Sequence, residues 1–293
     1  MDSPFTLVAD LQAQLAEGPV WDSAAQCLTV TDIPARTLWR ISPQTGESQR
    51  REIFEEVGCF APSLGGGLVA ACRSGIWSIP DAAEATCLAR NPEAHQSSRF
   101  NDGRIDPKGR LWAGTVDPYR QERAGLYRYD RRGLVRFADG LMTSNGLAFS
   151  PDGRLMYHSD TPRFRIYVYD YDQETGTPSN RRIFAQLTPT DMDQGRPDGA
   201  AVDAEGCYWS AFYQGARVVR FAPNGDILAS YRVPAQSPTM PCFGGPDMRT
   251  LFVTSARDGS SPEQLAQYPH SGGVFAMRVD VPGIAIPPFN PEI

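Results

Sequence analysis

Four oxygen-bearing side chains recur at one place in a repeating pattern, each followed within two residues by glycine: Glu17, Asn101, Asn145 and Asp198. Each alone is an ordinary turn former, because Asp-Gly, Asn-Gly and Glu-Gly-Pro commonly mark turns. Two carboxylates and two amides brought together would repel and lose hydration unless a cation neutralised them. The set therefore predicts a site for one divalent metal ion. Its oxygen donors suit Ca²⁺, Mg²⁺ or Mn²⁺, while Zn²⁺ and Fe²⁺ also accept carboxylates.

Other catalytic chemistries find little support in the residue types. The chain has three histidines, which lie far apart and at different places in the repeat: His95, His158 and His270. That distribution disfavours a histidine-rich zinc centre. The sequence contains no Gly-x-Ser-x-Gly elbow, no Gly-x-Gly-x-x-Gly turn and no Cys-x-x-Cys pair. Serine-hydrolase, nucleotide and redox-thiol chemistry are therefore disfavoured.

The candidate donors belong to a repeat of short strands. Six units open near residues 18, 60, 102, 146, 199 and 242, with spacings of 42, 42, 44, 53 and 43 residues. Units of about 40 to 50 residues with four strands each are typical of propeller blades. The sequence therefore predicts an all-β fold, a single six-bladed β-propeller over residues 1–293. A β-sandwich with extra strands would explain neither the number of units nor their period.

The propeller prediction says where the donors should lie. The first strand of every blade lines the central channel, so residues just before each first strand should converge on one axis. The strand expected at residues 5–12 precedes the first unit and can complete the last blade. Long connections at residues 117–124, 188–196 and 257–271 are expected on the same face as the donors and should shape a substrate pocket.

Composition narrows the partners. A net charge of -6 and a sequence pI of about 5.2 argue against nucleic acid, whose binding needs clustered cations. The first 16 residues lack the basic and apolar regions of a secretion signal, and no run is long enough to cross a membrane. The expectation is a cytoplasmic protein that acts on a small molecule, with no nucleic-acid or membrane partner. The oligomeric state stays open.

Several motifs together resemble a known family. They are Glu17-Gly18-Pro19-Val20-Trp21, Arg99-Phe100-Asn101-Asp102-Gly103, Ser144-Asn145-Gly146-Leu147 and Arg196-Pro197-Asp198-Gly199. The combination, over residues 7–281, resembles the gluconolactonase, regucalcin (senescence marker protein) and luciferin-regenerating enzyme family. The stretch from Pro241 to Phe275 is particularly similar to bacterial sugar-acid lactonases, including xylonolactonases and arabinolactonases. The resemblance implies metal-dependent hydrolysis of an aldonolactone, such as glucono-, xylono-, arabino- or galactonolactone.

The resemblance also implies roles for individual residues. Three would hold the metal: Glu17, Asn145 and Asp198. Arg99 and Asn101 would bind the substrate, and the donor pattern reaches Asn101 but not Arg99. Asp117, after Gly114-Thr115-Val116, matches an acidic family residue loosely and is a further substrate-contact candidate. Asp198 is also the group expected to take a proton from the attacking water, although a cation-bound carboxylate is a weakened base.

Other functions stay open on the sequence alone. A regulatory propeller could bind a divalent metal without turnover. A protein-interaction propeller would carry aromatic and charged hot spots instead of oxygen donors that line the channel. A hydrolase with the same metal site could act on another ester or on an organophosphate, because the ion can activate either electrophile.

Overall fold

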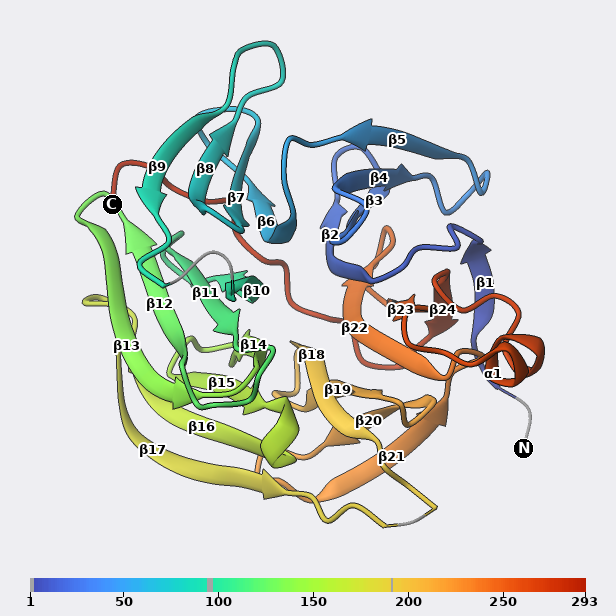
Figure 1. Ribbon diagram of the computed structural model, residues 1–293. Coiled ribbons are helices and arrows are strands. Elements are labelled where there is room, and N and C mark those ends of the chain that lie inside the picture. The colour runs from blue at the N-terminus through green and yellow to red at the C-terminus, as the bar shows by residue number, and fades with distance from the viewer. Residues whose placement is uncertain (1–2, 94–96, 191) are drawn as a thin grey trace. The chain divides into compact units, whose positions relative to one another are not determined.

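The structure is a computed structural model that describes residues 3–93, 97–190 and 192–293. The described residues form six four-stranded antiparallel sheets (Figure 1). In five of them the strands follow one another in sequence order, and in the sixth the first strand of the sequence lies beside the last. The chain divides into two compact units. We call Met1–Glu56 with Leu187–Ala285 the terminal unit, and Val57–Gln186 with Ile286–Ile293 the middle unit.

The terminal unit contains blades 1, 5 and 6. Blade 1 is made of β2 (Ala16–Asp22), β3 (Cys27–Asp32), β4 (Thr37–Ile41) and β5 (Ser48–Glu52). Blade 5 is made of β18 (Arg196–Val202), β19 (Tyr208–Tyr213), β20 (Arg217–Phe221) and β21 (Ile227–Arg232). Blade 6 is made of β22 (Ser237–Gly244), β23 (Thr250–Ala256), β24 (Val274–Arg278) and β1 (Thr6–Ala9). The short helix α1 (Pro262–Gln267) lies in the connection between β23 and β24.

The middle unit contains blades 2, 3 and 4. Blade 2 is made of β6 (Val57–Pro62), β7 (Leu68–Cys72), β8 (Gly75–Ile79) and β9 (Thr86–Arg90). Blade 3 is made of β10 (Arg99–Ile105), β11 (Leu111–Val116), β12 (Ala124–Asp130) and β13 (Gly133–Leu141). Blade 4 is made of β14 (Ser144–Phe149), β15 (Leu155–Asp160), β16 (Arg165–Asp172) and β17 (Thr177–Gln186), with the 3₁₀ turn η1 (Thr161–Arg163) after β15.

The N-terminal strand completes the last blade, as predicted. Strand β1 pairs antiparallel with β24, with Thr6 opposite Ala276 and Leu7 opposite Phe275. Blade 6 is therefore built from both ends of the sequence. This pairing covers an edge of β24 that would otherwise expose unpaired N–H and C=O groups.

Burial falls from the first strand of a blade to the fourth. All six residues of β14 are buried, whereas all five residues of β5 are exposed. The sequence of β5, Ser-Gln-Arg-Arg-Glu, has no apolar residue, and the charges on this edge strand disfavour pairing with other chains. Among the described residues, no helix has the length and apolar character of a membrane span.

All six first strands change register where they pair with the second strand; in β6 one extra residue, Gly58, interrupts the pairing, and in the other five a β-bulge places two residues opposite one. In β2, Glu17 is opposite Thr31 but Val20 is opposite Thr29, so two residues face one. The same interruption occurs in β10, β14, β18 and β22. The first strands begin at Ala16, Val57, Arg99, Ser144, Arg196 and Ser237. The prediction that the donors precede the first strands is therefore wrong, because pairing continues on both sides of the bulge and the donors lie inside the strands.

The C-terminal segment packs into the middle unit. The Phe289 N–H donates to the Pro62 carbonyl at 2.8 Å, and the Phe289 carbonyl accepts from the Leu64 N–H at 2.9 Å. The Phe289 side chain is only 3% exposed and stacks on Tyr129, with the ring centroids 5.9 Å apart. This contact gives the last residues of the sequence a place in a hydrophobic core.

We predict that Phe289→Ala lowers the free energy of unfolding by about 3 to 5 kcal/mol, the usual cost of removing a buried phenyl ring. Urea denaturation followed by tryptophan fluorescence measures the change. Ile286→Ala is the matched control, because Ile286 is 42% exposed in the same segment and should change stability by less than about 0.5 kcal/mol. A Phe289→Ala cost no larger than that of the control would show that the segment adds nothing to the core.

Candidate metal and substrate site

The bulges hold every predicted donor at one of two adjacent positions. Glu17 and Asn145 are the last paired residues before their bulges, while Asn101 and Asp198 are the first residues inside theirs. Gly18 and Gly146 follow the first two donors with φ of 53° and 62°, a left-handed conformation that favours glycine. The sequence pattern predicted that the four donors share one position in the repeat, whereas the structure places them at two neighbouring positions. A β-bulge commonly changes the direction in which a side chain points.

All four donors are buried. The exposed fractions are 7% for Glu17, 8% for Asn101, 2% for Asn145 and 5% for Asp198. Buried polar side chains need hydrogen bonds or ions to offset the loss of hydration. The four donors are therefore buried polar groups instead of solvated turn residues.

In the middle unit a chain of side-chain hydrogen bonds joins blades 3 and 4. Arg99 Nη1 donates to Asn101 Oδ1 at 2.7 Å, and Asn101 Nδ2 donates to Asn145 Oδ1 at 2.8 Å. Asn145 Nδ2 in turn donates to Thr161 Oγ1 at 2.9 Å. Each amide therefore has a defined oxygen end and a defined nitrogen end. The structure brings together three of the predicted residues, and it adds Thr161, which the sequence did not single out.

Asp102 reinforces the same junction. Its carboxylate accepts the Gly103 N–H at 2.7 Å and the Leu147 N–H at 2.9 Å, which ties β10 to β14. Burial raises the pKa of Asp102 to about 6, although the Arg104 guanidinium and the backbone N–H groups oppose the shift. The Asn-Asp-Gly sequence is the signal that marks this residue, but the motif alone does not distinguish a turn former from an interblade contact.

In the terminal unit the two carboxylates lie on different first strands. Glu17 Oε2 accepts the N–H of Gly18 at 3.1 Å. Asp198 lies near the Tyr213 phenol: burial is the main cause that raises the pKa of Tyr213, and the negative charges of Asp198 and Asp258 add to it. Thr239 occupies in β22 the bulge position that Asp198 has in β18, and its hydroxyl donates to the Ala16 carbonyl at 2.6 Å.

Asp117 has a defined structural role. Its two carboxylate oxygens accept the N–H groups of Tyr119 at 3.0 Å, Gln121 at 2.6 Å and Arg123 at 3.3 Å. The side chain is buried and organises the connection between β11 and β12. Its assignment as a substrate contact stays a prediction.

The donor set fits a hard divalent cation by its chemistry. Glu17 and Asp198 supply carboxylates, and Asn145 supplies an amide oxygen whose orientation its two hydrogen bonds fix. Over the described ranges, no three His, Cys, Asp or Glu side chains gather as metal ligands. That finding agrees with a set that contains only two carboxylates. His158 is buried, His270 pairs with Asp10 at the surface, and His95 lies outside the described residues.

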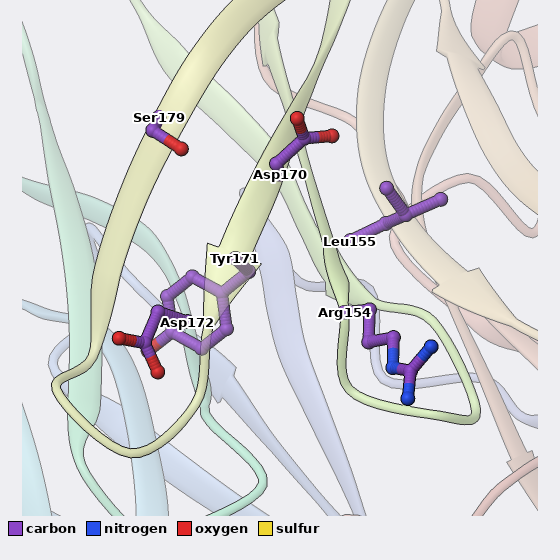
Figure 2. Close-up of a pocket in the computed structure, with 6 residues that line it drawn as sticks. All are labelled: Arg154, Leu155, Asp170, Tyr171, Asp172 and Ser179. Atoms are coloured by element: carbon purple, nitrogen blue, oxygen red, sulfur yellow. The ribbon is translucent and has the colours of Figure 1, made fainter.

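A separate groove lies on blade 4. It has a volume of about 440 Å³ and is lined by Arg154, Leu155, Asp170, Tyr171, Asp172 and Ser179. Figure 2 shows Asp170, Tyr171 and Asp172 on β16 next to Ser179 on β17. None of these residues belongs to the predicted donor set, so the groove is not part of the candidate site.

Comparison with known proteins identifies the family. Residues 15–257 match the SMP-30/Gluconolactonase/LRE-like region, and the chain belongs to this family. A 6-deoxy-6-sulfogluconolactonase of Pseudomonas putida is 44% identical over 292 residues, covering 99% of each chain. Regucalcin of Xenopus laevis is 34% identical over 282 residues, covering 93% of each chain.

A solved structure shows the same fold. The regucalcin of Agrobacterium tumefaciens, described as a calcium-binding protein, superposes with a TM-score of 0.91 at 27% identity. The match covers 97% of this chain and 96% of that one. The predicted family, the six-bladed β-propeller and the assignment to the lactonase class of enzymes are thereby confirmed.

The burial of His158 should make the stability of the protein depend on pH. Its Nε2 lies 2.8 Å from Ser144 Oγ, and burial lowers the pKa of His158 to about 3, with the Arg181 charge adding to the shift. The unfolded chain takes up a proton below an ordinary histidine pKa of about 6.5, whereas the folded chain does not until near pH 3. Neutral His158 thus favours folding above pH 6.5, and this contribution is lost as pH falls from there towards 3.

We expect His158 to account for a loss of about 2 kcal/mol in unfolding free energy between about pH 7.5 and pH 5. Denaturant titrations of the wild type and His158→Gln at both pH values isolate this term, since only the wild type carries the titrating ring. The variant should show the smaller loss. Equal losses in the two proteins would mean that His158 is protonated without penalty in the folded state.

Proposed function

We propose that the chain hydrolyses a sugar lactone to the corresponding aldonic acid with the help of one divalent metal ion. The observation that carries the proposal is the set of buried oxygen donors at the bulges of a chain in this family. The names of its relatives support the reaction class, since they include a sulfogluconolactonase that matches along the full length. We treat residues 1–293 as one functional domain.

We assign the ion to Glu17, Asn145 and Asp198. When bound, a divalent ion supplies Lewis-acid polarisation of the lactone carbonyl, which is worth several kcal/mol of transition-state stabilisation. The all-oxygen set favours a hard ion such as Ca²⁺, Mg²⁺ or Mn²⁺, and Zn²⁺ and Fe²⁺ remain candidates for testing. The description of the Agrobacterium relative as calcium-binding supports calcium as the first ion to test.

The remaining residues orient the substrate and move the proton. Arg99 donates hydrogen bonds to lactone hydroxyl or carbonyl oxygens, and Asn101 accepts from a lactone hydroxyl at Oδ1, because its Nδ2 already donates to the Ser144 carbonyl and to Asn145. The 2.7 Å bond between Arg99 and Asn101 holds both side chains in place before the substrate arrives. Asp198 accepts the proton of the attacking water. Asp117 is the further candidate for a substrate contact, on the connection that its carboxylate organises.

An aldonolactone is the substrate class, and an anionic member is a specific candidate within it. The relative with 44% identity over 99% of the chain is named for a gluconolactone that carries a sulfonate. Neutral glucono-, xylono-, arabino- and galactonolactones are the other members to test.

The test is lactone hydrolysis in a pH-stat, using enzyme stripped by a chelator and then supplied with each of the five ions. We expect stripping to remove turnover and one or two ions to restore it. Asp198→Asn and Glu17→Gln should each lower kcat/KM by at least about a hundredfold, as expected when a charge-stabilising group is lost. Asp226→Asn is the control, because Asp226 is an exposed acid in the same unit.

Two outcomes would contradict the proposal. Tight metal binding without hydrolysis of any lactone would favour a non-catalytic metal-binding propeller. Full turnover of Asp198→Ala at full metal occupancy would overturn the assignment of Asp198 as the proton acceptor.

A further inference from the structure

In the five first strands where two residues face one, the first residue of the strand is either small and buried or a partly buried arginine. This position pairs with the second strand four residues before the ladder resumes beyond the bulge. In three blades it is a small buried residue: Ala16, Ser144 or Ser237. In β10 and β18 it is an arginine that is only partly buried, Arg99 or Arg196. Two blades therefore place a long cationic side chain where the others bury a small one.

Arg99 and Arg196 precede the predicted donors in the same way. Arg99 lies two residues before Asn101, and Arg196 lies two residues before Asp198. The resemblance to known lactonases implies substrate binding for Arg99 only. The repeat gives Arg196 the equivalent position in blade 5, on the strand that carries a metal ligand in the proposed function.

The guanidinium of Arg196 is held by two neighbours at the end of β19. It lies over the Tyr213 ring, 5.6 Å from the ring centroid, and its Nη2 donates to Gln214 Oε1. Stacking on an aromatic face fixes the plane of a guanidinium, and the fork of N–H donors then points in a defined direction. Arg196 is thus organised before any ligand binds.

Tyr213 links this arginine to the candidate site. Tyr213 lies opposite Arg196 in the pairing of β18 with β19, and the negative charge of Asp198 contributes to the raised pKa of its phenol. The negative charge of Asp258, in the connection between β23 and β24, also contributes to the raised pKa of this phenol. Arg196 itself ends the connection at residues 188–196, one of the three expected to shape the substrate pocket.

We propose that Arg196 and Tyr213 form a subsite for a negatively charged substituent of the lactone. The proposal rests on the proposed function, because the subsite serves the same substrate. A planar guanidinium matches the two oxygens of a carboxylate or sulfonate better than any other side chain. The Tyr213 hydroxyl donates a further hydrogen bond to the same group.

Two nearby carboxylates indicate that an anion would be recognised by direct hydrogen bonds to Arg196 and not by long-range attraction to its charge. Asp198 and Asp258 oppose an anion, so attraction at long range cannot explain recognition here. Direct hydrogen bonds from the fixed guanidinium are needed. Lysine keeps the charge of arginine but lacks the planar fork, and it therefore separates the two effects.

The experiment compares gluconolactone with an analogue that carries a sulfonate or carboxylate on its terminal carbon. Wild type, Arg196→Gln, Arg196→Lys and Tyr213→Phe are assayed with the metal that restores activity. We expect Arg196→Gln to raise KM for the anionic lactone by about tenfold to a hundredfold, the usual effect of losing a charge-assisted hydrogen bond. The rise for gluconolactone should stay below about threefold. Arg196→Lys should recover only a minor part of the loss.

Arg232→Gln is the matched control, because it removes one exposed arginine from the outer strand of the same blade. It should change the two KM values alike. Melting temperatures show that each variant is folded, and Tyr213→Phe provides a second test that keeps the stacked ring.

Equal KM changes for the two lactones in both Arg196→Gln and Tyr213→Phe would overturn the subsite while leaving lactone hydrolysis in place. Full recovery by Arg196→Lys would also overturn it, because charge alone would then suffice. A wild type that hydrolyses neither lactone would defeat the proposed function, and the subsite with it.

Discussion

The interrupted pairing between the first and second strands of a blade is the constraint on which the candidate site depends. An uninterrupted ladder would keep successive side chains alternating between the two faces of the sheet. The bulge places two residues opposite one, so that Asn101 and Asp198 leave the ladder while the strand continues on both sides. The same device appears in five blades, which turns a structural repeat into a repeated position for functional side chains.

The two units use this position with different chemistry. In the middle unit the donors are amides, and the chain from Arg99 through Asn101 to Asn145 satisfies and orients them. In the terminal unit the donors are the carboxylates of Glu17 and Asp198. Taking an ionised carboxylate out of water costs several kcal/mol, and a divalent cation offsets that cost directly. The carboxylates whose charge a divalent cation would neutralise therefore lie in the terminal unit.

The sequence predicted the blades well because their signals are local. Turn residues recur at a nearly constant period. The strand expected at residues 5–12 precedes the first blade, so the last blade is the sheet that it can complete. The motif with glycine also singled out Glu17, Asn145 and Asp198, which the structure buries; their role as metal ligands stays a proposal. The family resemblance supplied Arg99, which a search for oxygen donors overlooks.

Other features could not be predicted because they depend on register and packing. A bulge shifts the pairing by one residue without a unique sequence signal, so the donors were expected before the strands instead of within them. The pattern gave no indication that the Asp117 carboxylate accepts N–H groups from its own connection. Phe289 is far in sequence from its partners Pro62 and Tyr129, and only the fold brings them together.

The most direct test of the central claim is the number of divalent ions bound per chain. Equilibrium dialysis followed by elemental analysis measures it for the wild type, Glu17→Gln, Asp198→Asn and a buried-donor control, Thr239→Ser. The account predicts one ion per chain in the wild type and in Thr239→Ser, and at least tenfold weaker binding in each carboxylate variant. Binding that is absent from the wild type, or unchanged when Glu17 and Asp198 are both replaced, would contradict the claim that the bulges present the ligands of a metal centre.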